Sequence, residues 1–196
     1  MEACKTNHRH FAIYKPYGYL SQFSSNDSKQ QSKNFLGKLY VFPENIMAIG
    51  RLDEKSEGLL LLTTDGKMSD FVNSRKVDKE YYSLVDGDIT EEAIEKLEGG
   101  VEIGFNGKKY KTKPCKVFKL NDEPDLPKRA KKIRDARHGP TTWISVTLNE
   151  GKFRQVRKMT SAVGFPTLRL VRVRVGNIYI KSMQVGEVIE VESFNV

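Results

Sequence analysis

One short segment concentrates the residue types that can do acid–base or nucleophilic chemistry. Residues 50–60 read GRLDEKSEGLL, so Asp53, Glu54 and Glu57 directly precede an apolar run. Polar groups at the end of a buried strand are well placed to line a cleft, and glycines allow a ligand to approach the backbone. A free Asp has a pKa of about 3.9, so it is charged at neutral pH and can attack an electrophile or take a proton. The pattern alone favours an ordinary charged surface loop over a catalytic one.

Other catalytic motifs are missing from the sequence. It contains no GxxxxGK[ST] phosphate loop, no GxGxxG turn and no GxSxG elbow. His8, His10 and His138 are scattered, without the HExxH spacing of a zinc site, and Cys4 and Cys115 form no CxxC pair. Two isolated thiols argue against a disulfide framework, and we expect both to be reduced in a cytosol. We therefore predict no metal and no cofactor, which leaves carboxylates, tyrosines and arginines to carry any chemistry.

The charge of the chain suits a polyanionic partner. The 196 residues carry a net charge of +8 and have a sequence pI of about 9.4. Each Lys or Arg that neutralises a phosphate releases a condensed counterion, so a basic protein binds nucleic acid more readily. A protein that simply happens to be basic fits the same numbers. No apolar run approaches the roughly 20 residues of a membrane span, and the first ten residues show no signal peptide.

The strongest basic run lies in a long polar connection, residues 121–142. We interpret it as a grip on an RNA backbone, although such runs are often only solvated surface. Only one acid, Asp135, interrupts it. Its six cations are Lys128, Arg129, Lys131, Lys132, Arg134 and Arg137.

The remaining pattern predicts a mixed α/β chain of the α+β class, dominated by strands. Thr90 suits the N-cap of a helix over 90–100, and Gly164 suits the end of another helix that follows Gly151. In the segment 168–175 two sets of apolar residues alternate in opposite parity, so we predict a bulge near Leu170. Strands are expected at 11–14, 58–63, 81–85, 143–148 and 168–175, with a further short helix at 67–72.

Four segments together resemble the motifs of the RsuA-type family of bacterial rRNA pseudouridine synthases. The family's central motif reads G-R-L-D-x-x-[ST]-x-G-L-[LI], and residues 50–60 match it. Residues 14–16 (YKP) resemble the early K-P element, and residues 79–81 (KEY) resemble the K-x-Y segment. Residues 150–159 (EGKFRQVRKM) resemble E-G-[RK]-x-x-Q-V-R-[RK]-M. The motifs occur in the family's order and span most of the chain.

The resemblance implies a fold, an activity and roles for named residues. The fold is the pseudouridine synthase fold, a mostly antiparallel mixed sheet with flanking helices and a central RNA-binding cleft. Asp53 is the catalytic carboxylate, Arg157 is its partner, and Tyr81 is the flat partner of a flipped base. The residue-level alternatives are a phosphate contact for Arg157 and core packing for Tyr81. RNA contacts are expected at Lys15, Arg51, Arg154 and Lys158, the alternative for Arg51 being a salt bridge to Glu54 or Glu57.

Within the family, three further segments resemble the RluE branch, which modifies 23S rRNA. They are EPDLP followed by basic residues, TTWISVTLNEG and AVGFPTLRLVRV. That branch lacks the N-terminal S4 module, and with about ten residues before Phe11 we expect none here. We expect a single catalytic domain over 1–196, with two possible lobes formed by 1–50 with 143–180 and by 51–142. A monomer in the cytoplasm, with ribosomal RNA as its partner, completes the expectation.

Two other functions remain open from the sequence. A non-catalytic RNA-binding or ribosome-assembly factor with the same fold explains the charge and the strands, but not an acid that faces RNA. A sugar-processing hydrolase that uses Asp53 with Glu54 or Glu57 leaves the basic surplus unexplained. The exact uridine is not written in the motifs, because RNA shape and single-stranded context usually decide it.

Overall fold

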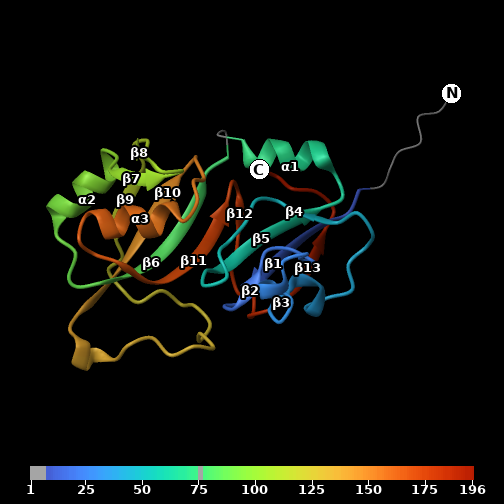
Figure 1. The fold of residues 1–196 in the computed structure, drawn as a ribbon, viewed down its shortest axis with the longest axis horizontal. Coiled ribbons are helices and arrows are strands. Elements are labelled where there is room, and N and C mark those ends of the chain that lie inside the picture. Colours follow the sequence, from blue (N-terminus) through green and yellow to red (C-terminus); the bar gives the residue numbers. More distant parts are fainter. Residues whose placement is uncertain (1–7, 75–76) are drawn as a thin grey trace.

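The computed structural model describes residues 8–74 and 77–196, and strands dominate it (Figure 1). The helices are α1 Gly66–Asn73, α2 Glu91–Glu98 and α3 Gln155–Ala162. Three single-turn 3-10 helices, η1 Ser28–Gln30, η2 Leu36–Lys38 and η3 Ala136–His138, lie in the connections. The strands are β1 His10–Lys15, β2 Tyr19–Leu20, β3 Asn34–Phe35, β4 Met47–Ala48, β5 Glu57–Thr63, β6 Lys79–Asp86, β7 Glu102–Phe105, β8 Lys108–Lys111, β9 Lys116–Lys119, β10 Thr141–Leu148, β11 Thr167–Val175, β12 Ile178–Tyr179 and β13 Val188–Val191.

One nine-stranded sheet joins the two ends of the molecule. Its strand order is β13-β1-β5-β11-β6-β10-β9. In addition, β4 pairs with β5, and β12 pairs with β11. All of its pairings are antiparallel except that of β5 with β11. Figure 1 shows α1 over the half that contains β1 and β5, and α2 and α3 over the half that contains β6 and β10. The predicted α+β class with a mostly antiparallel sheet is confirmed.

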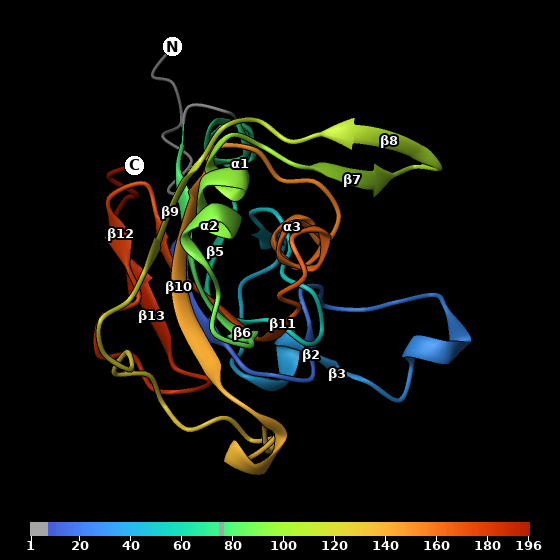
Figure 2. The same ribbon diagram turned by 90° about the vertical axis from the view of Figure 1, so that its left-hand side faces the viewer.

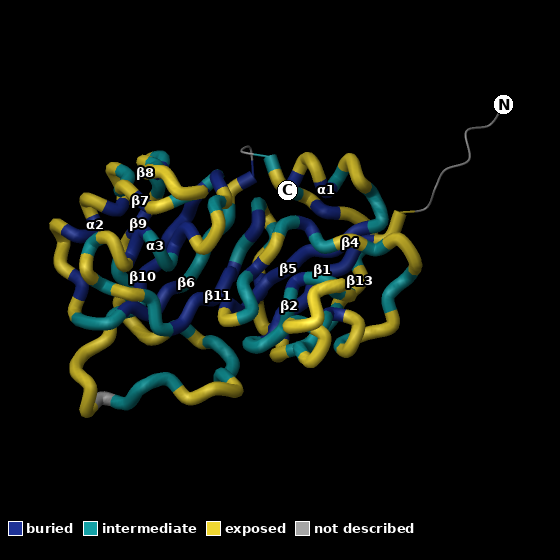
Figure 3. The backbone as a smooth tube through the Cα atoms, in the orientation of Figure 1, coloured by how far each residue is buried: buried dark blue, intermediate teal, exposed yellow. Residues whose placement is uncertain are grey.

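Strand β5 forms the centre of the core, and all seven of its residues are buried. Leu59 and Leu61 pack into the cluster beneath α1, whereas Leu60 and Leu62 pack with Phe11 on the opposite face. A strand covered on both faces reads as a continuous apolar run rather than an alternating one. The sequence-based prediction of a doubly buried strand at 58–63 is therefore confirmed, and Figure 3 shows its burial along the tube.

The parallel contact between β5 and β11 depends on a glycine. Gly58 lies opposite Arg172 and has a φ of +104°, a conformation that side chains rarely adopt. A Cβ atom at this position would lie 2.4 Å from the Arg172 carbonyl oxygen and 2.7 Å from its nitrogen. The two backbones can therefore approach only because residue 58 has no side chain.

Strand β11 is irregular where it pairs with β6. The register shifts between Thr167 and Arg169 and again between Arg172 and Arg174. The expected irregularity is confirmed, but it flanks Leu170 rather than coinciding with it. Leu170 packs into the core beneath α3, and Val171 packs into the core on the other face of the sheet. Both apolar sets are buried because both faces of the strand are covered, so no slip at Leu170 is needed.

The three expected helices are present and their starts follow the usual chemistry. The side chain of Asp65 accepts from the backbone N–H of Lys67 at the start of α1, and that of Thr90 accepts from Ala93 N–H in α2. Helix α3 differs, because its N-cap residue Arg154 is left-handed, with a φ of +55°, and makes no capping bond through its side chain. None of the helices in the described part of the chain has the length and apolar character needed to cross a membrane.

The division into two lobes stays a proposal. Hydrogen bonding joins β10 to β6 and β9, which both come from the stretch 51–142. Strand β11 lies between β5 and β6 in the sheet. This strand order favours a boundary along β11 over the grouping of 143–180 with 1–50.

We predict that Gly58→Ala lowers the free energy of unfolding by about 2–4 kcal/mol, because it adds backbone strain and a clash in one step. Urea denaturation measures the change. Gly66→Ala is the matched control, since an added Cβ there meets no atom within 4 Å. We expect the control to change stability by less than about 1 kcal/mol. Equal effects of the two substitutions would contradict the close approach at Gly58.

Candidate active site

A cavity of about 70 Å³ lies where the segment before β5 meets α3 and β6. The predicted site residues Arg51, Asp53, Tyr81 and Arg154 all line it. The rest of its wall consists of apolar residues, Ser56 from the turn before β5, and residues from the start of α3 and the loop before it. These residues are Leu52, Ser56, Leu148, Glu150, Gly151, Lys152, Gln155, Val156 and Leu170.

The turn that carries Asp53 is fixed from the side of β2. The hydroxyl of buried Ser21 donates to the carbonyl of Leu52 at 2.8 Å and accepts from its N–H at 2.9 Å. The N–H of Gly18 donates to the carbonyl of Glu54 at 2.8 Å, and within the turn Ser56 N–H donates to Asp53 O at 3.0 Å. These bonds hold the backbone on both sides of Asp53 before any ligand is present.

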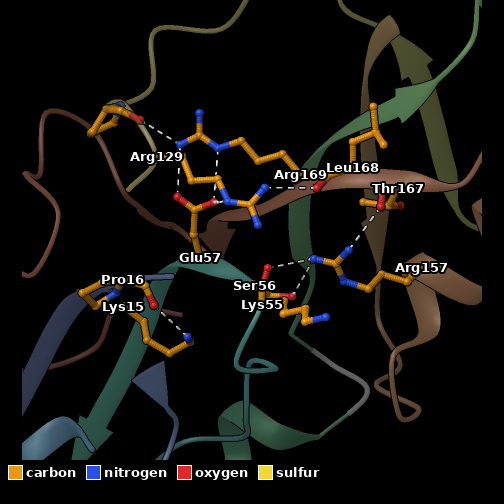
Figure 4. Close-up of polar contacts among 11 residues, drawn as sticks. Lys15, Pro16, Lys55, Ser56, Glu57, Arg129, Arg157, Thr167, Leu168 and Arg169 are labelled. Atoms are coloured by element: carbon orange, nitrogen blue, oxygen red, sulfur yellow. Dashed lines mark hydrogen bonds and ion pairs between the residues drawn. The ribbon is translucent and has the colours of Figure 1, made fainter. Parts of the chain in front are cut away.

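Arg157 fixes the same turn from the side of α3. Its guanidinium donates to the carbonyl of Lys55 at 2.9 Å and to the carbonyl of Thr167 at 3.3 Å, as Figure 4 shows. Its Nε lies 4.0 Å from Asp53 Oδ2, and that of Arg154 lies 3.8 Å away. Burial lowers the pKa of Arg157, and the Asp53 charge opposes that shift. Two guanidinium groups therefore lie beside the Asp53 carboxylate, both from the segment at the start of α3.

The two adjacent tyrosines of β6 point to opposite faces, as strand alternation predicts. Tyr81 lies half-buried at the cavity wall and packs against the cores on that face. Tyr82 packs against the core on the far face, beside Leu126. Of these two tyrosines, Tyr81 is therefore the one that can contact a ligand in the cavity.

Glu150 is a hub of the site that the sequence reasoning did not single out. It is 6% exposed, and its Oε1 accepts from Gln155 Nε2 at 2.6 Å and from Lys113 N–H at 3.0 Å. Its Oε2 accepts from the hydroxyl of Tyr110 at 2.5 Å. Gln155 in turn accepts from Lys152 N–H at 2.9 Å. The E-G-x-x-x-Q spacing was the available signal, because it places a carboxylate beside an amide at the start of a helix.

The other predicted RNA contacts near the cavity differ in their surroundings. Arg51 is exposed, and among the described residues Glu54 pairs with Lys33 at 2.6 Å instead of with Arg51. Arg154 is 49% exposed beside Asp53. Lys158 is half-buried, and its ammonium group donates to the carbonyl of Gly104 at 2.7 Å. Arg51 and Arg154 therefore present charge to solvent at the cavity, whereas Lys158 ties α3 to β7.

The predicted RNA contact at Lys15 is wrong. Its side chain is fully buried, and its Nζ donates to the carbonyls of Pro16 at 2.9 Å and Tyr19 at 2.7 Å. Burial lowers the pKa of Lys15 to about 7. The presence of a lysine before a proline in the sequence does not show whether its side chain is exposed. Here strand β1 directs the side chain of Lys15 into the protein.

Two cations of the predicted grip in 128–137 are also used inside the protein. Arg129 is 9% exposed, with its guanidinium 4.0 Å above the ring of Tyr17 and its Nε 3.5 Å from Glu57 Oε2. Figure 4 shows Arg129 and Arg169 gathered around the Glu57 carboxylate. Arg134 pairs with Asp86 and donates to the carbonyl of Pro140 at 3.0 Å. Arg129 and Arg134 therefore bind the connection to the sheet, which weighs against their part in the RNA grip.

The exposed cations of that connection stay candidates for RNA. Lys128, Lys131 and Lys132 are exposed, and Arg137 is exposed but pairs with Asp135 at 2.7 Å. Such a surface pair is worth little, because water screens it. Among residues 8–74 and 77–196 no acid pairs with these three lysines, and the arginines Arg129 and Arg134 hold the segment that carries them in place.

The carboxylate pair of a hydrolase is not assembled at this cavity. Glu57 is 1% exposed and accepts two hydrogen bonds of 3.2 Å from Arg169, away from the cavity wall. Glu150 does line the cavity, but both of its oxygens are occupied by Gln155, Lys113 and Tyr110. Neither Glu57 nor Glu150 is therefore available as a second carboxylate beside Asp53. This weighs against the two-carboxylate mechanism of a glycoside hydrolase.

No group of His, Cys, Asp and Glu that could hold a metal ion occurs among residues 8–74 and 77–196. The thiol of Cys115 donates to the carbonyl of Leu97, and burial raises the pKa of that thiol to about 11. Cys4 lies outside the described residues, so the expectation for it remains a prediction.

Comparison with known proteins places this arrangement in a family. The family model described as RNA pseudouridylate synthase matches residues 9–162, and these contain the cavity residues except Leu170. The chain belongs to the RNA pseudouridylate synthase family. The resemblance drawn from the four motifs is thus confirmed, and the relatives of this family member cover nearly its whole length.

Relatives and a solved structure agree with this placement. The chain is 38% identical over 188 residues to the "Ribosomal large subunit pseudouridine synthase E" of Vibrio parahaemolyticus, covering 95% of this chain and 75% of that protein. It is 40% identical over 177 residues to the protein of the same name from Xanthomonas campestris pv. campestris, covering 89% and 91%. A "Crystal structure of pseudouridylate synthase" matches with a TM-score of 0.73 at 25% identity, covering 94% and 70%. The predicted pseudouridine synthase fold is confirmed.

We predict that the stabilising effect of Lys15, relative to Lys15→Met, increases as pH rises from 7 to 10. The folded pKa of Lys15 is about 7, against about 10.4 for an unfolded lysine. Between these two pKa values Lys15 is protonated in the unfolded chain but not in the folded one, so the free energy of unfolding rises with pH. Below the folded pKa, Lys15 makes no pH-dependent contribution to stability. Urea denaturation at pH 6, 8 and 10 tests this.

The exposed Lys67→Met serves as the control, because its ammonium group stays in water in both states. A flat stability difference between wild type and Lys15→Met over the whole range would show that Lys15 keeps its proton inside the fold.

Proposed function

We propose that this chain isomerises a specific uridine of 23S rRNA to pseudouridine, with Asp53 as the catalytic nucleophile. The observation that carries the proposal is the position of Asp53. It lies at a cavity wall, with two arginine Nε atoms at 3.8 and 4.0 Å and Tyr81 lining the same cavity. The names of the relatives add the substrate, since they are ribosomal large subunit enzymes.

The reaction breaks the N1–C1′ bond of uridine and forms a C5–C1′ bond after the base turns. The proton on C5 leaves, and one returns to N1, so no redox or phosphoryl step is required. Asp53 attacks C1′ or stabilises the positive charge that develops there, and then helps to remove the C5 proton. Arg157 and Arg154 lie beside its carboxylate and orient it for that attack.

The target uridine must leave its stack before C1′ is within reach of Asp53. Tyr81 offers its ring to the flipped base, and Arg51 fills the gap in the RNA or holds the adjacent phosphate. The cavity opens to solvent, and the exposed side chains of Arg51 and Arg154 at its wall are free to shift as the base enters.

The remaining partners follow from the substrate. Arg154 and Lys158 on the side of α3, and Lys128, Lys131 and Lys132 of the basic connection, contact the RNA backbone. We further propose a single catalytic domain that works as a monomer in the cytoplasm, with no cofactor. A ribosome-assembly factor of the same fold is the alternative, and the turn that positions Asp53 argues for the enzyme, because binding alone needs no fixed acid.

We predict that Asp53→Asn abolishes isomerisation and leaves RNA binding largely intact, since it removes the charge and the nucleophile without changing the size of the side chain. Tritium release from C5-labelled uridine in 23S rRNA reports turnover, and filter binding reports affinity. Asp70→Asn, on the exposed surface of α1, is the matched control. Turnover of Asp53→Asn within about tenfold of wild type, or about 1.4 kcal/mol of barrier, would overturn the assignment.

We predict that Arg157→Ala lowers the single-turnover rate at saturating RNA by at least tenfold and changes affinity less. The reason is that the side chain is 12% exposed and directed at the Asp53 turn rather than at solvent. Arg154→Ala, which removes a half-exposed side chain, should weaken binding relatively more. An Arg157→Ala variant with lost affinity and an unchanged saturated rate would identify Arg157 as a phosphate contact instead.

A further inference from the structure

The hairpin of β7 and β8 stands apart from the nine-stranded sheet and forms a two-stranded ladder of its own. Asn106 and Gly107 make its turn, with φ angles of +49° and +74° that match a tight type I′ connection. Figure 2 shows the hairpin extending from the side of the molecule on which α3 lies, the same side as the loop that carries η1. Lys152 lines the cavity and its ammonium group lies 5.0 Å from the ring centre of Tyr110 in β8, so the hairpin projects beside the cavity.

The outward surface of the hairpin is basic. Pairing of Gly104 with Lys109 and of Glu102 with Lys111 puts these four residues on one face of the ladder. Lys109 pairs with Glu102 at 2.8 Å, but their side chains are 83% and 56% exposed, so the pair is worth little. Lys108, beside the turn, pairs with Phe105 and so lies on the opposite face of the ladder, but it is exposed as well. The hairpin therefore carries three exposed lysines against one exposed glutamate.

The opposite face of the hairpin is tied to the active site. Tyr110 donates to Glu150, which also holds Gln155 at the start of α3. The ammonium group of Lys152 lies 5.0 Å from the ring centres of both Phe105 and Tyr110. An isolated two-stranded hairpin is barely stable in water, so these ties are what hold it out in one orientation.

We propose that the β7–β8 hairpin is an arm that binds the phosphate backbone of the RNA next to the flipped uridine, through Lys108, Lys109 and Lys111. This rests on the proposed function, because it assigns the arm to the same RNA. Glu150 joins the base of the arm to the segment that carries Arg154. Phosphates bound by the arm are therefore held at a fixed position relative to Asp53. The arm also supplies cations in place of Arg129 and Arg134, which are used inside the protein.

Lysines on the exposed edge of a hairpin have another use, which is to prevent pairing with strands of other molecules. That use gives the lysines no role in RNA binding. The two explanations differ in the salt dependence of binding, since each phosphate contact contributes about 0.7 to 0.9 to the slope of log K against log salt.

The test compares two triple variants with wild type. The arm variant combines Lys108→Gln, Lys109→Gln and Lys111→Gln. The control variant combines Lys96→Gln, Lys116→Gln and Lys181→Gln, which removes the same charge from exposed positions on α2, on β9 and after β12. Binding of a 23S rRNA transcript is measured at several salt concentrations, and tritium release is measured at saturating RNA for all three proteins.

The arm variant should lower the magnitude of the salt slope by about 0.7 or more beyond the control and weaken binding at low salt, with the saturated rate within about threefold of wild type. Salt slopes that match the control would overturn the proposal. A saturated rate that falls more than tenfold with an unchanged slope would also overturn it. If wild type itself releases no tritium, the proposed function fails, and the comparison of slopes still decides whether the arm binds RNA.

Discussion

The placement of Asp53 depends on one short turn that is held from two sides. Ser21 binds the backbone of Leu52 from the side of β2, and Arg157 binds the carbonyl of Lys55 from the side of α3. The two halves of the sheet meet at this point, because β5 starts directly after the turn and runs parallel to β11. Any movement of α3 relative to β5 therefore changes the distance between the arginines and the carboxylate. Preorganised charges of this kind stabilise a developing transition state without reorganising during the reaction.

Much of the fold followed from local patterns. The apolar run of β5, the Thr90 cap and the alternation of Tyr81 and Tyr82 have short-range causes, and each was predicted correctly. The bulges of β11 were displaced from the expected position because its two apolar sets face two different cores, and only the tertiary fold shows how many faces of a strand are covered. Strand order was equally out of reach, since the parallel contact at Gly58 joins segments more than a hundred residues apart.

The site was predictable where a motif carried the chemistry and unpredictable where exposure decided the role. Asp53, Tyr81 and Arg157 come together as the motif order implied. The roles of Lys15 and Arg129 were not predictable, because residue type alone does not reveal whether carbonyls, a carboxylate or water will surround the charge. The hairpin was missed for the converse reason: its lysines are spread along a strand, and only the fold shows that this strand belongs to a separate hairpin that Tyr110 ties to Glu150. Charge that is free for a ligand is thus a property of the fold.

The central claim is that a carboxylate fixed in this turn makes the chain a uridine isomerase of the large ribosomal RNA. Carbodiimide-based pseudouridine mapping tests it most directly, on 23S rRNA incubated with and without the protein. A mass measurement alone would miss the product, because pseudouridine has the same mass as uridine. The account predicts one new site of modification in 23S rRNA and none in 16S rRNA. An unchanged map, on both free 23S rRNA and large-subunit precursors, would contradict it.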